Sequence, residues 1–164
     1  MTKTVEAPQN QQNFSRQVAF WKPYLKDGKA LGAVALFNYS EKNNRVFLEI
    51  RPQLLSETNQ NSFDKENSIR AMLGLPDIGE FLAVFRGRKQ GLGSPDDKNG
   101  WKGLFHKNEN GSTSISMVAT DRGYSLSVGS KRGNDQAVRL GLNLTIAEGE
   151  VLHDYLSEML KEMF

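Results

Sequence analysis

Polar and apolar residues alternate along most of the chain from Lys29 onward, which is the pattern of strands with one buried and one exposed face. Runs that indicate strands occupy residues 29–39, 45–54, 68–75, 101–108, 112–120, 123–131 and 137–144. Turn-forming pairs such as Asn43-Asn44 and Asn110-Gly111 separate several of these runs, as they do in hairpins. We therefore predict antiparallel strands joined largely by short loops.

A short segment between the third and fourth runs changes to the helical period. Its apolar residues fall at positions i, i+3, i+4 and i+7, namely Ile78, Phe81, Leu82 and Phe85. Pro76 is tolerated at the first helical position, and Gly87 can end a helix. These signals predict a helix over residues 76–86.

A second helical pattern closes the chain, in TIAEGEVLHDYLSEMLKEMF. Thr145 and Glu148 have the spacing of a capping box, in which each side chain bonds the other residue's backbone N–H. An apolar stripe follows at helical spacing: Ile146, Val151, Leu152, Tyr155, Leu156, Met159 and Met163. We predict a terminal helix whose apolar face packs on the core or on a partner subunit.

The order of elements is then strands, helix, four strands, helix, which predicts an α+β fold of two antiparallel sheets, or one strongly curved sheet, with the helices against one face. A chain of 164 residues is long enough for one packed domain, which we place at residues 26–164. Residues 1–25 are rich in Gln and Asn near their start and lack the apolar run of a targeting signal. We expect them to form a flexible N-terminal segment.

Composition excludes several classes of chemistry. The chain has no cysteine, and its two histidines are far apart in sequence, so disulfides, thiolate sites and a histidine metal site are not expected. The carboxylate pairs Asp96-Asp97 and Glu148-Glu150 have no base or metal ligand near them in sequence, so we expect no enzyme activity and no cofactor. No run reaches the length of a membrane span, and we expect a cytoplasmic protein.

Rings and cations alternate with core residues in the stretch RVFLEIRPQL. Val46, Leu48 and Ile50 share one face of that strand, which leaves the Phe47 ring between Arg45 and Arg51 on the other. Single-stranded nucleic acid binds such surfaces, because unpaired bases stack on aromatic rings while lysine and arginine neutralise phosphates. The region from Arg86 to Lys107 adds a local charge of +4, from six basic and two acidic residues.

The full set of candidate nucleic-acid-binding residues combines these rings and cations. It is Lys29, Phe37, Tyr39, Lys42, Arg45, Phe47, Arg51, Arg88, Lys89, Trp101, Lys102, Lys107, Tyr124, Lys131, Arg132 and Arg139. Three of the rings, Phe37, Tyr39 and Tyr124, have apolar strand neighbours and are as compatible with the core as with the surface. The glycine-rich basic loop at 86–102 is either a binding arm or an ordinary solvated loop. Serines 114, 116, 125 and 127 form an outward row around Arg139 in the second set of strands.

The chain resembles the Whirly proteins in its order of elements and in three stretches of sequence. These are GKALGAVALF in the first sheet, SIRAMLGLPDIGEFLAVFRG from strand to helix, and GLFHK after that helix. The resemblance extends to the wider positive-cofactor-four-like group of single-stranded DNA binders and covers residues 26–164. It implies two sheets packed roughly at right angles, a multimer core built from the helices, and single-stranded DNA lying across the sheets. Carried over by position, it implies roles for Lys29, Phe47, Arg51, Phe105 and His106.

The leading hypothesis is a non-catalytic, homo-oligomeric binder of single-stranded DNA with little sequence preference, acting in replication, recombination or transcription. An RNA-binding or annealing factor of the same fold is an alternative, because stacking surfaces accept either polymer. A second alternative is a structural subunit without a nucleic-acid ligand, in which Phe47 is a hot spot of a protein interface. The number of subunits, dimer, tetramer or larger, is open at this point.

Overall fold

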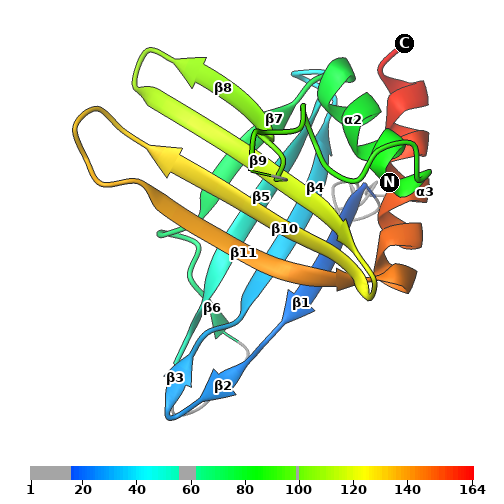
Figure 1. Cartoon of the computed structure of the whole chain (residues 1–164). Coiled ribbons are helices and arrows are strands. Elements are labelled where there is room, and N and C mark those ends of the chain that lie inside the picture. Colours follow the sequence, from blue (N-terminus) through cyan, green and yellow to red (C-terminus); the bar gives the residue numbers. More distant parts are fainter. Residues whose placement is uncertain (1–15, 56–61, 99) are drawn as a thin grey trace, which may run out of the picture.

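The computed structural model describes residues 16–55, 62–98 and 100–164, and it contains two main antiparallel sheets (Figure 1). The first sheet has the order β1-β4-β5-β6, and a further strand, β7, also pairs with β5. Its strands are β1 (Gln17–Lys22), β4 (Ala33–Ser40), β5 (Arg45–Leu54), β6 (Ser62–Phe63) and β7 (Ile69–Leu73). The strands of the second sheet cross over those of the first in Figure 1, which confirms the predicted fold class.

The second sheet is a meander of four strands in the order β11-β10-β9-β8. These strands are β8 (Leu104–Asn108), β9 (Gly111–Thr120), β10 (Gly123–Lys131) and β11 (Val138–Thr145). A separate two-stranded hairpin, β2 (Leu25–Lys26) with β3 (Lys29–Ala30), projects from the first sheet at the bottom of Figure 1. The predicted strands at 45–54, 112–120 and 123–131 are confirmed to within one residue at each end.

The two helices of the described residues, α2 (Leu75–Phe85) and α3 (Ile146–Glu162), contact each other beside the sheets. The N-terminus of α2 is capped by the Asp77 carboxylate, which accepts a hydrogen bond from the Gly74 backbone N–H at 2.9 Å. At α3 the predicted capping box is present: the Glu148 N–H donates to Thr145 Oγ1 at 3.1 Å, and the Thr145 N–H donates to Glu148 Oε1 at 2.9 Å. Both predicted helices are therefore confirmed, with α2 beginning one residue earlier than expected.

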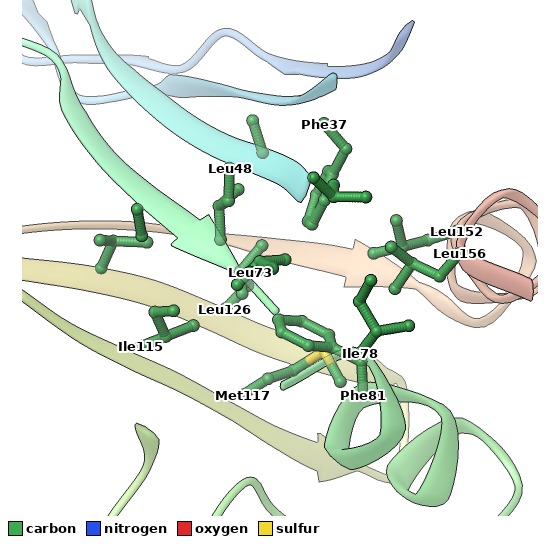
Figure 2. Packing of buried hydrophobic residues seen from close by; sticks show 14 of the residues in the cluster. Phe37, Leu48, Leu73, Ile78, Phe81, Ile115, Met117, Leu126, Leu152 and Leu156 are labelled. Carbon is green, nitrogen blue, oxygen red and sulfur yellow. The ribbon is translucent and has the colours of Figure 1, made fainter. Parts of the chain in front are cut away.

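The core lies between the two sheets and the helices. Figure 2 shows side chains from all of these layers pointing toward one another: Phe37, Leu48, Leu73, Ile78, Phe81, Ile115, Met117, Leu126, Leu152 and Leu156. Each of these residues is fully buried. Such close-packed apolar contact between layers is what fixes how the two sheets sit on each other.

The folded domain begins earlier in the chain than the sequence pattern predicted. Residues 17–22 form β1, which pairs with β4 from Gln17 opposite Asn38 to Lys22 opposite Ala33. Two contacts tie β1 to the terminal helix, because Lys22 forms an ion pair with Glu148 and the Tyr155 hydroxyl donates to the Arg16 carbonyl. The expectation of a flexible segment up to residue 25 is therefore wrong from Arg16 onward, and its remainder lies outside the described residues.

Candidate nucleic-acid interface

The outward row of β5 is the starting point of the site. Val46, Leu48 and Ile50 are fully buried, whereas Phe47 and Arg51 on the opposite face of the same strand are partly exposed. This is the alternation predicted from the sequence, and it places the Phe47 ring on the outer face of the first sheet.

Phe47 does not stand alone on that face, because Arg70 of β7 lies over its ring. The register of β5 and β7 sets Glu49 opposite Arg70 and Phe47 opposite Met72. From its position diagonal to Phe47, the Arg70 guanidinium carbon lies 4.1 Å from the centre of the Phe47 ring. This is a close cation–π contact, and it joins an aromatic surface to a phosphate-binding group in one unit.

Glu49 is the counter-charge of this surface. Its carboxylate accepts two hydrogen bonds from Arg51, from Nε at 2.9 Å and from Nη2 at 3.2 Å. Burial alone would raise the pKa of the Glu49 carboxyl, but hydrogen bonds and charge from Arg51, with smaller effects from Ser68 and Arg70, hold that pKa below its ordinary value. Glu49 is therefore ionised at neutral pH and partly neutralises both arginines.

Three clefts in the surface meet at Arg70. The smallest, of about 230 Å³, lies on the outer face of the first sheet and includes Phe47, Arg51 and Lys65 in its lining. A second, of about 400 Å³, runs between β7 and the β8–β9 hairpin. A third, of about 610 Å³, continues toward Lys131 and Arg132 at the loop between β10 and β11. Neighbouring clefts share lining residues, so we consider the three together as the junction groove, which extends from the first sheet to the ends of the second.

The outer face of the second sheet carries another cation held over small residues. Arg139 donates to Ser127 Oγ at 2.7 Å and to Ser114 Oγ at 3.1 Å, so its guanidinium lies flat across β10. A side chain at Gly129 would crowd this arrangement, because its Cβ would fall 2.7 Å from Ser114 Oγ. Phe105 lies on the same face and is 64% exposed. Of the predicted row of hydroxyls around this cation, Ser114 and Ser127 contact Arg139.

Two predicted stacking rings are buried, and a third packs against a helix. Phe37 is fully buried, Tyr39 is 9% exposed, and both point into the core. Tyr124 packs edge to face against Phe85 of α2, with ring centres 4.9 Å apart. The assignment of Phe37 and Tyr39 as binding residues is therefore wrong, because no base can reach their buried faces, whereas Tyr124 is partly exposed with the helices against one side of its ring.

The basic loop after α2 is held against the second sheet. The Leu92 N–H donates to the Met117 carbonyl at 3.0 Å, and the Ala119 N–H donates to the Gln90 carbonyl at 2.7 Å. Lys89 forms an ion pair with Glu80 and lies 5.5 Å from the centre of the Trp101 ring. The loop is therefore a packed connection and not a free arm, and Lys89 and Trp101 mainly stabilise it.

The remaining predicted cations are spread over the surface. Lys29 lies on the projecting β2–β3 hairpin and Lys42 in the turn between β4 and β5, and both are exposed. Arg45 is partly exposed on β5, and one of its Nη groups donates to the Asn44 carbonyl at 3.0 Å. Arg88 and Lys102 are exposed in the loop before β8. Of the predicted set, the structure brings Phe47, Arg51, Lys107, Lys131 and Arg132 to the junction groove.

Four residues of this surface were missed by sequence reasoning. Arg70 and Met72 alternate with the buried Ile69, Ala71 and Leu73, a signal that was present in SIRAML. Trp21, 56% exposed on β1, packs its ring 5.3 Å from that of Phe63 on the same sheet. Trp21 was missed because it lies in the segment interpreted as a flexible lead-in.

The described residues contain no group of three or more His, Asp or Glu side chains arranged to hold a metal ion. His106 has a single acidic neighbour, with its Nε2 3.1 Å from Asp77 Oδ2 at the start of α2. Within the described part of the chain, neither helix is both long and apolar enough to cross a membrane.

Comparison with known proteins finds a likeness of fold. No family model matches the sequence, and no curated protein matches it. Among solved structures, the chain is similar to the plant transcriptional regulator PBF-2, a Whirly-family protein, with a TM-score of 0.57 and 12% identity over 90% of this chain and 74% of that one. At this identity the match shows the Whirly-like fold and nothing finer.

Proposed function

We propose that this protein is a non-catalytic binder of single-stranded nucleic acid, with DNA preferred over RNA and little sequence specificity. The observation that carries the proposal is the Phe47 ring on the outer face of the first sheet, with the Arg70 guanidinium 4.1 Å from its centre where three clefts meet. A base can stack on an aromatic–arginine unit of this kind, and the arginine also serves the adjacent phosphate.

Duplex DNA fits the molecule less well. The major groove of a duplex is commonly read by a helix with basic residues along one face. Helix α2 contains no lysine or arginine, and α3 contains only Lys161. The cations lie instead beside strands and loops, where a flexible single strand can follow a curved path.

A role in replication, recombination or transcription follows from such binding. The similar fold of a transcriptional regulator supports the last of these most directly. We further propose that the protein is a homo-oligomer assembled through its helices. Ile146 and Val151 are apolar residues of α3 that are 56% and 52% exposed, and a partner subunit would cover them.

Fluorescence anisotropy with a labelled single strand of about 30 nucleotides, at two salt concentrations, tests the proposal, since affinity for phosphates falls steeply with salt. We expect the protein to bind the single strand with an affinity that falls as salt rises, and we expect duplex DNA to displace the labelled strand poorly. Single-stranded RNA serves as a second competitor. Light scattering on the same sample gives the number of subunits.

The decisive variant is Phe47→Ala with Arg70→Gln, which we expect to lose roughly 1–3 kcal/mol for the stacking contact and more for the charge. The control pair is Phe164→Ala with Lys161→Gln, which likewise removes one aromatic ring and one positive charge, from the exposed end of α3 and the short segment that follows it. Equal affinity of the two double variants would overturn this assignment of the site. Absence of any binding at low salt would overturn the function and leave Phe47 as a candidate protein-interface residue.

A further inference from the structure

We infer that the part of the junction groove between β7 and the β8–β9 hairpin holds one nucleotide of the bound strand and selects bases that carry carbonyl oxygens. This inference rests on the proposed function and deepens it, because it converts a surface without sequence preference into one that favours guanine, thymine and cytosine over adenine.

The place of this subsite follows from the topology. β7 pairs only with β5, and β8 pairs only with β9, so each has one edge unpaired among the described strands. The cleft of about 400 Å³ lies beside these two edges, and residues from both β7 and β8 line it. An occupant of this cleft would be held between the two sheets and would not merely rest on one of them.

The wall formed by the first sheet is suited to the flat face of a base. Phe47 and Met72 are direct cross-strand partners, and both line the cleft. Met72 is 50% exposed, because it lies on the face of β7 opposite to the buried Ala71 and Leu73. A ring and a polarizable thioether together give an apolar surface that accepts any base by stacking.

The opposite wall is rich in hydrogen-bond donors. It includes the Lys107 ammonium group, the Thr113 hydroxyl and the Asn108 side chain. Asn108 Oδ1 already accepts a hydrogen bond from the Asn110 N–H at 3.0 Å, which leaves its amide Nδ2 group to donate. A wall with more donors than acceptors favours the carbonyl oxygens of guanine, thymine and cytosine, which adenine lacks.

The phosphate of the same nucleotide has a place in the adjoining cleft. That cleft, of about 610 Å³, shares the lining residues Arg70, Asn108 and Thr113 with the 400 Å³ cleft. Its lining also includes Lys131 and Arg132. Glu66 is the acidic residue in its lining, so cations outnumber carboxylates there. The two clefts thus have the complementary chemistry of a nucleotide, with a stacking and donor-rich end for the base and a cationic end for the phosphate.

The test uses methionine methyl groups as reporters in the full-length protein. The chain has five methionines, of which Met72 lines the cleft and Met117 is fully buried in the core. Protein labelled with ¹³C at the methionine methyls is titrated with dTMP, dGMP, dCMP, dAMP and deoxyribose 5-phosphate. We expect the Met72 signal to shift and the Met117 signal to stay, with dTMP, dGMP and dCMP binding roughly two- to tenfold tighter than dAMP, the difference that one hydrogen bond makes.

Thr113→Val removes one donor while keeping the shape of the side chain, and we expect the preference of dTMP over dAMP to fall. Thr120→Val, at the exposed far end of the same strand, is the matched control and should leave the preference unchanged. Should Thr113→Val lower the melting temperature, Asn108→Asp replaces it as the test variant, because it keeps the oxygen that accepts from the Asn110 N–H and removes the amide donor.

The outcomes separate the inference from the function on which it rests. Equal affinity for all four nucleotides, or no shift at Met72, in a protein that binds single-stranded DNA would overturn the nucleotide subsite and leave the proposed function standing. A failure to bind single-stranded DNA would overturn both. Binding of deoxyribose 5-phosphate as tight as that of dTMP would show that the cleft reads phosphate alone, which also contradicts the inference.

Discussion

The Arg70 guanidinium occupies a face of Phe47 that a base could otherwise cover, and this contact sets how the site can work. A base can stack on the exposed part of the ring beside the guanidinium, or on the guanidinium itself, since arginine planes stack on bases as rings do. The opposing Glu49 restrains the pair by holding Arg51 and sitting across from Arg70. In the absence of nucleic acid, the positive charge of Arg51 and Arg70 is therefore partly neutralised by Glu49.

Removing the Glu49 charge should strengthen binding. In Glu49→Gln, Arg51 loses its carboxylate partner and becomes free to contact a phosphate, so the affinity for single-stranded DNA should rise. The slope of log affinity against log salt should steepen by about 0.7 for each added phosphate contact. Glu158→Gln on α3 removes the same charge at a remote, exposed position and is the control for net charge. Weaker binding of Glu49→Gln would mean that Glu49 positions Arg51 for the phosphate.

At the scale of single residues, the sequence predicts which side chains are exposed only in strands that have one buried and one exposed face. Phe47 was placed correctly because charged residues flank it on its own face of β5. Phe37 could not be placed, because β4 is buried on both faces: Val34 and Leu36 on one side are as inaccessible as Ala35 and Phe37 on the other. The contact of Phe47 with Arg70 depends on how β5 and β7 pair, and this register cannot be predicted from the sequence of either strand alone.

At the scale of elements, each helix contains a glycine, and the two glycines have opposite surroundings. Gly79 of α2 has no atom near the position that a Cβ would take. At Gly149 of α3, a Cβ would lie 2.3 Å from Cε2 of the Tyr124 ring, which itself packs against Phe85. The missing side chain of Gly149 is thus what lets α3 approach β10.

Alanine substitution at these glycines should therefore change stability in opposite directions. Gly79→Ala should raise the free energy of unfolding by about 0.5–1 kcal/mol, the usual cost of glycine inside a helix. Gly149→Ala gains the same helix propensity, but it displaces the Tyr124 ring and should lower the free energy of unfolding overall. Urea unfolding followed by circular dichroism measures both, and a stabilised Gly149→Ala would contradict the packing described for α3.

The elements themselves were largely predictable, and the exceptions have local causes. β1 was missed because it follows a long polar stretch and is closely followed by Pro23, so the alternation in QVAFWK is short and lies outside the main periodic region. The strand is held by contacts that lie far away in sequence, such as the ion pair of Lys22 with Glu148. Only tertiary structure reveals such contacts.

At the scale of the whole molecule, two half-buried acids, Glu49 and Glu148, make stability depend on pH. The pKa of Glu148 would be raised by burial, but hydrogen bonds from Lys22 and Thr145 and the charge of Lys22 hold it below its ordinary value, as Arg51 does for Glu49. Because both acids bind protons more weakly in the folded state, their stabilising effect is complete above the pKa of the unfolded chain. It is lost as the pH falls through the lower folded-state values.

We therefore expect the melting temperature to be nearly constant above about pH 5 and to fall in more acidic solution. Lys22→Met removes the partner of Glu148 and should make the acidic decline shallower. Lys161→Met, which breaks the exposed pair with Glu158, is the control and should not alter the slope. An unchanged pH profile for Lys22→Met would contradict the role of this pair in joining β1 to α3.

How the two sheets meet was beyond the reach of the alternating pattern. The alternating pattern alone left open two sheets or one strongly curved sheet, and the family resemblance implied two sheets. The junction groove depends on the relative placement of β7 and β8, which are separated by α2 and the packed loop. None of its clefts could be predicted from residues 69–73 or 104–108 taken separately.

The attachment of β1 to α3 also affects the order in which parts of the chain can fold during synthesis. The partners of its two contacts are 126 and 139 residues apart, so they bring together nearly the first and the last parts of the described chain. During synthesis these contacts form only after the last helix has left the ribosome, when the rest of the first sheet has already been made. Contacts between such distant residues slow folding, because a long loop must close before they form. The two contacts that join β1 to α3 thus form late, whereas the pairing of β1 with β4, which places Trp21 opposite Val34, joins residues much closer in sequence.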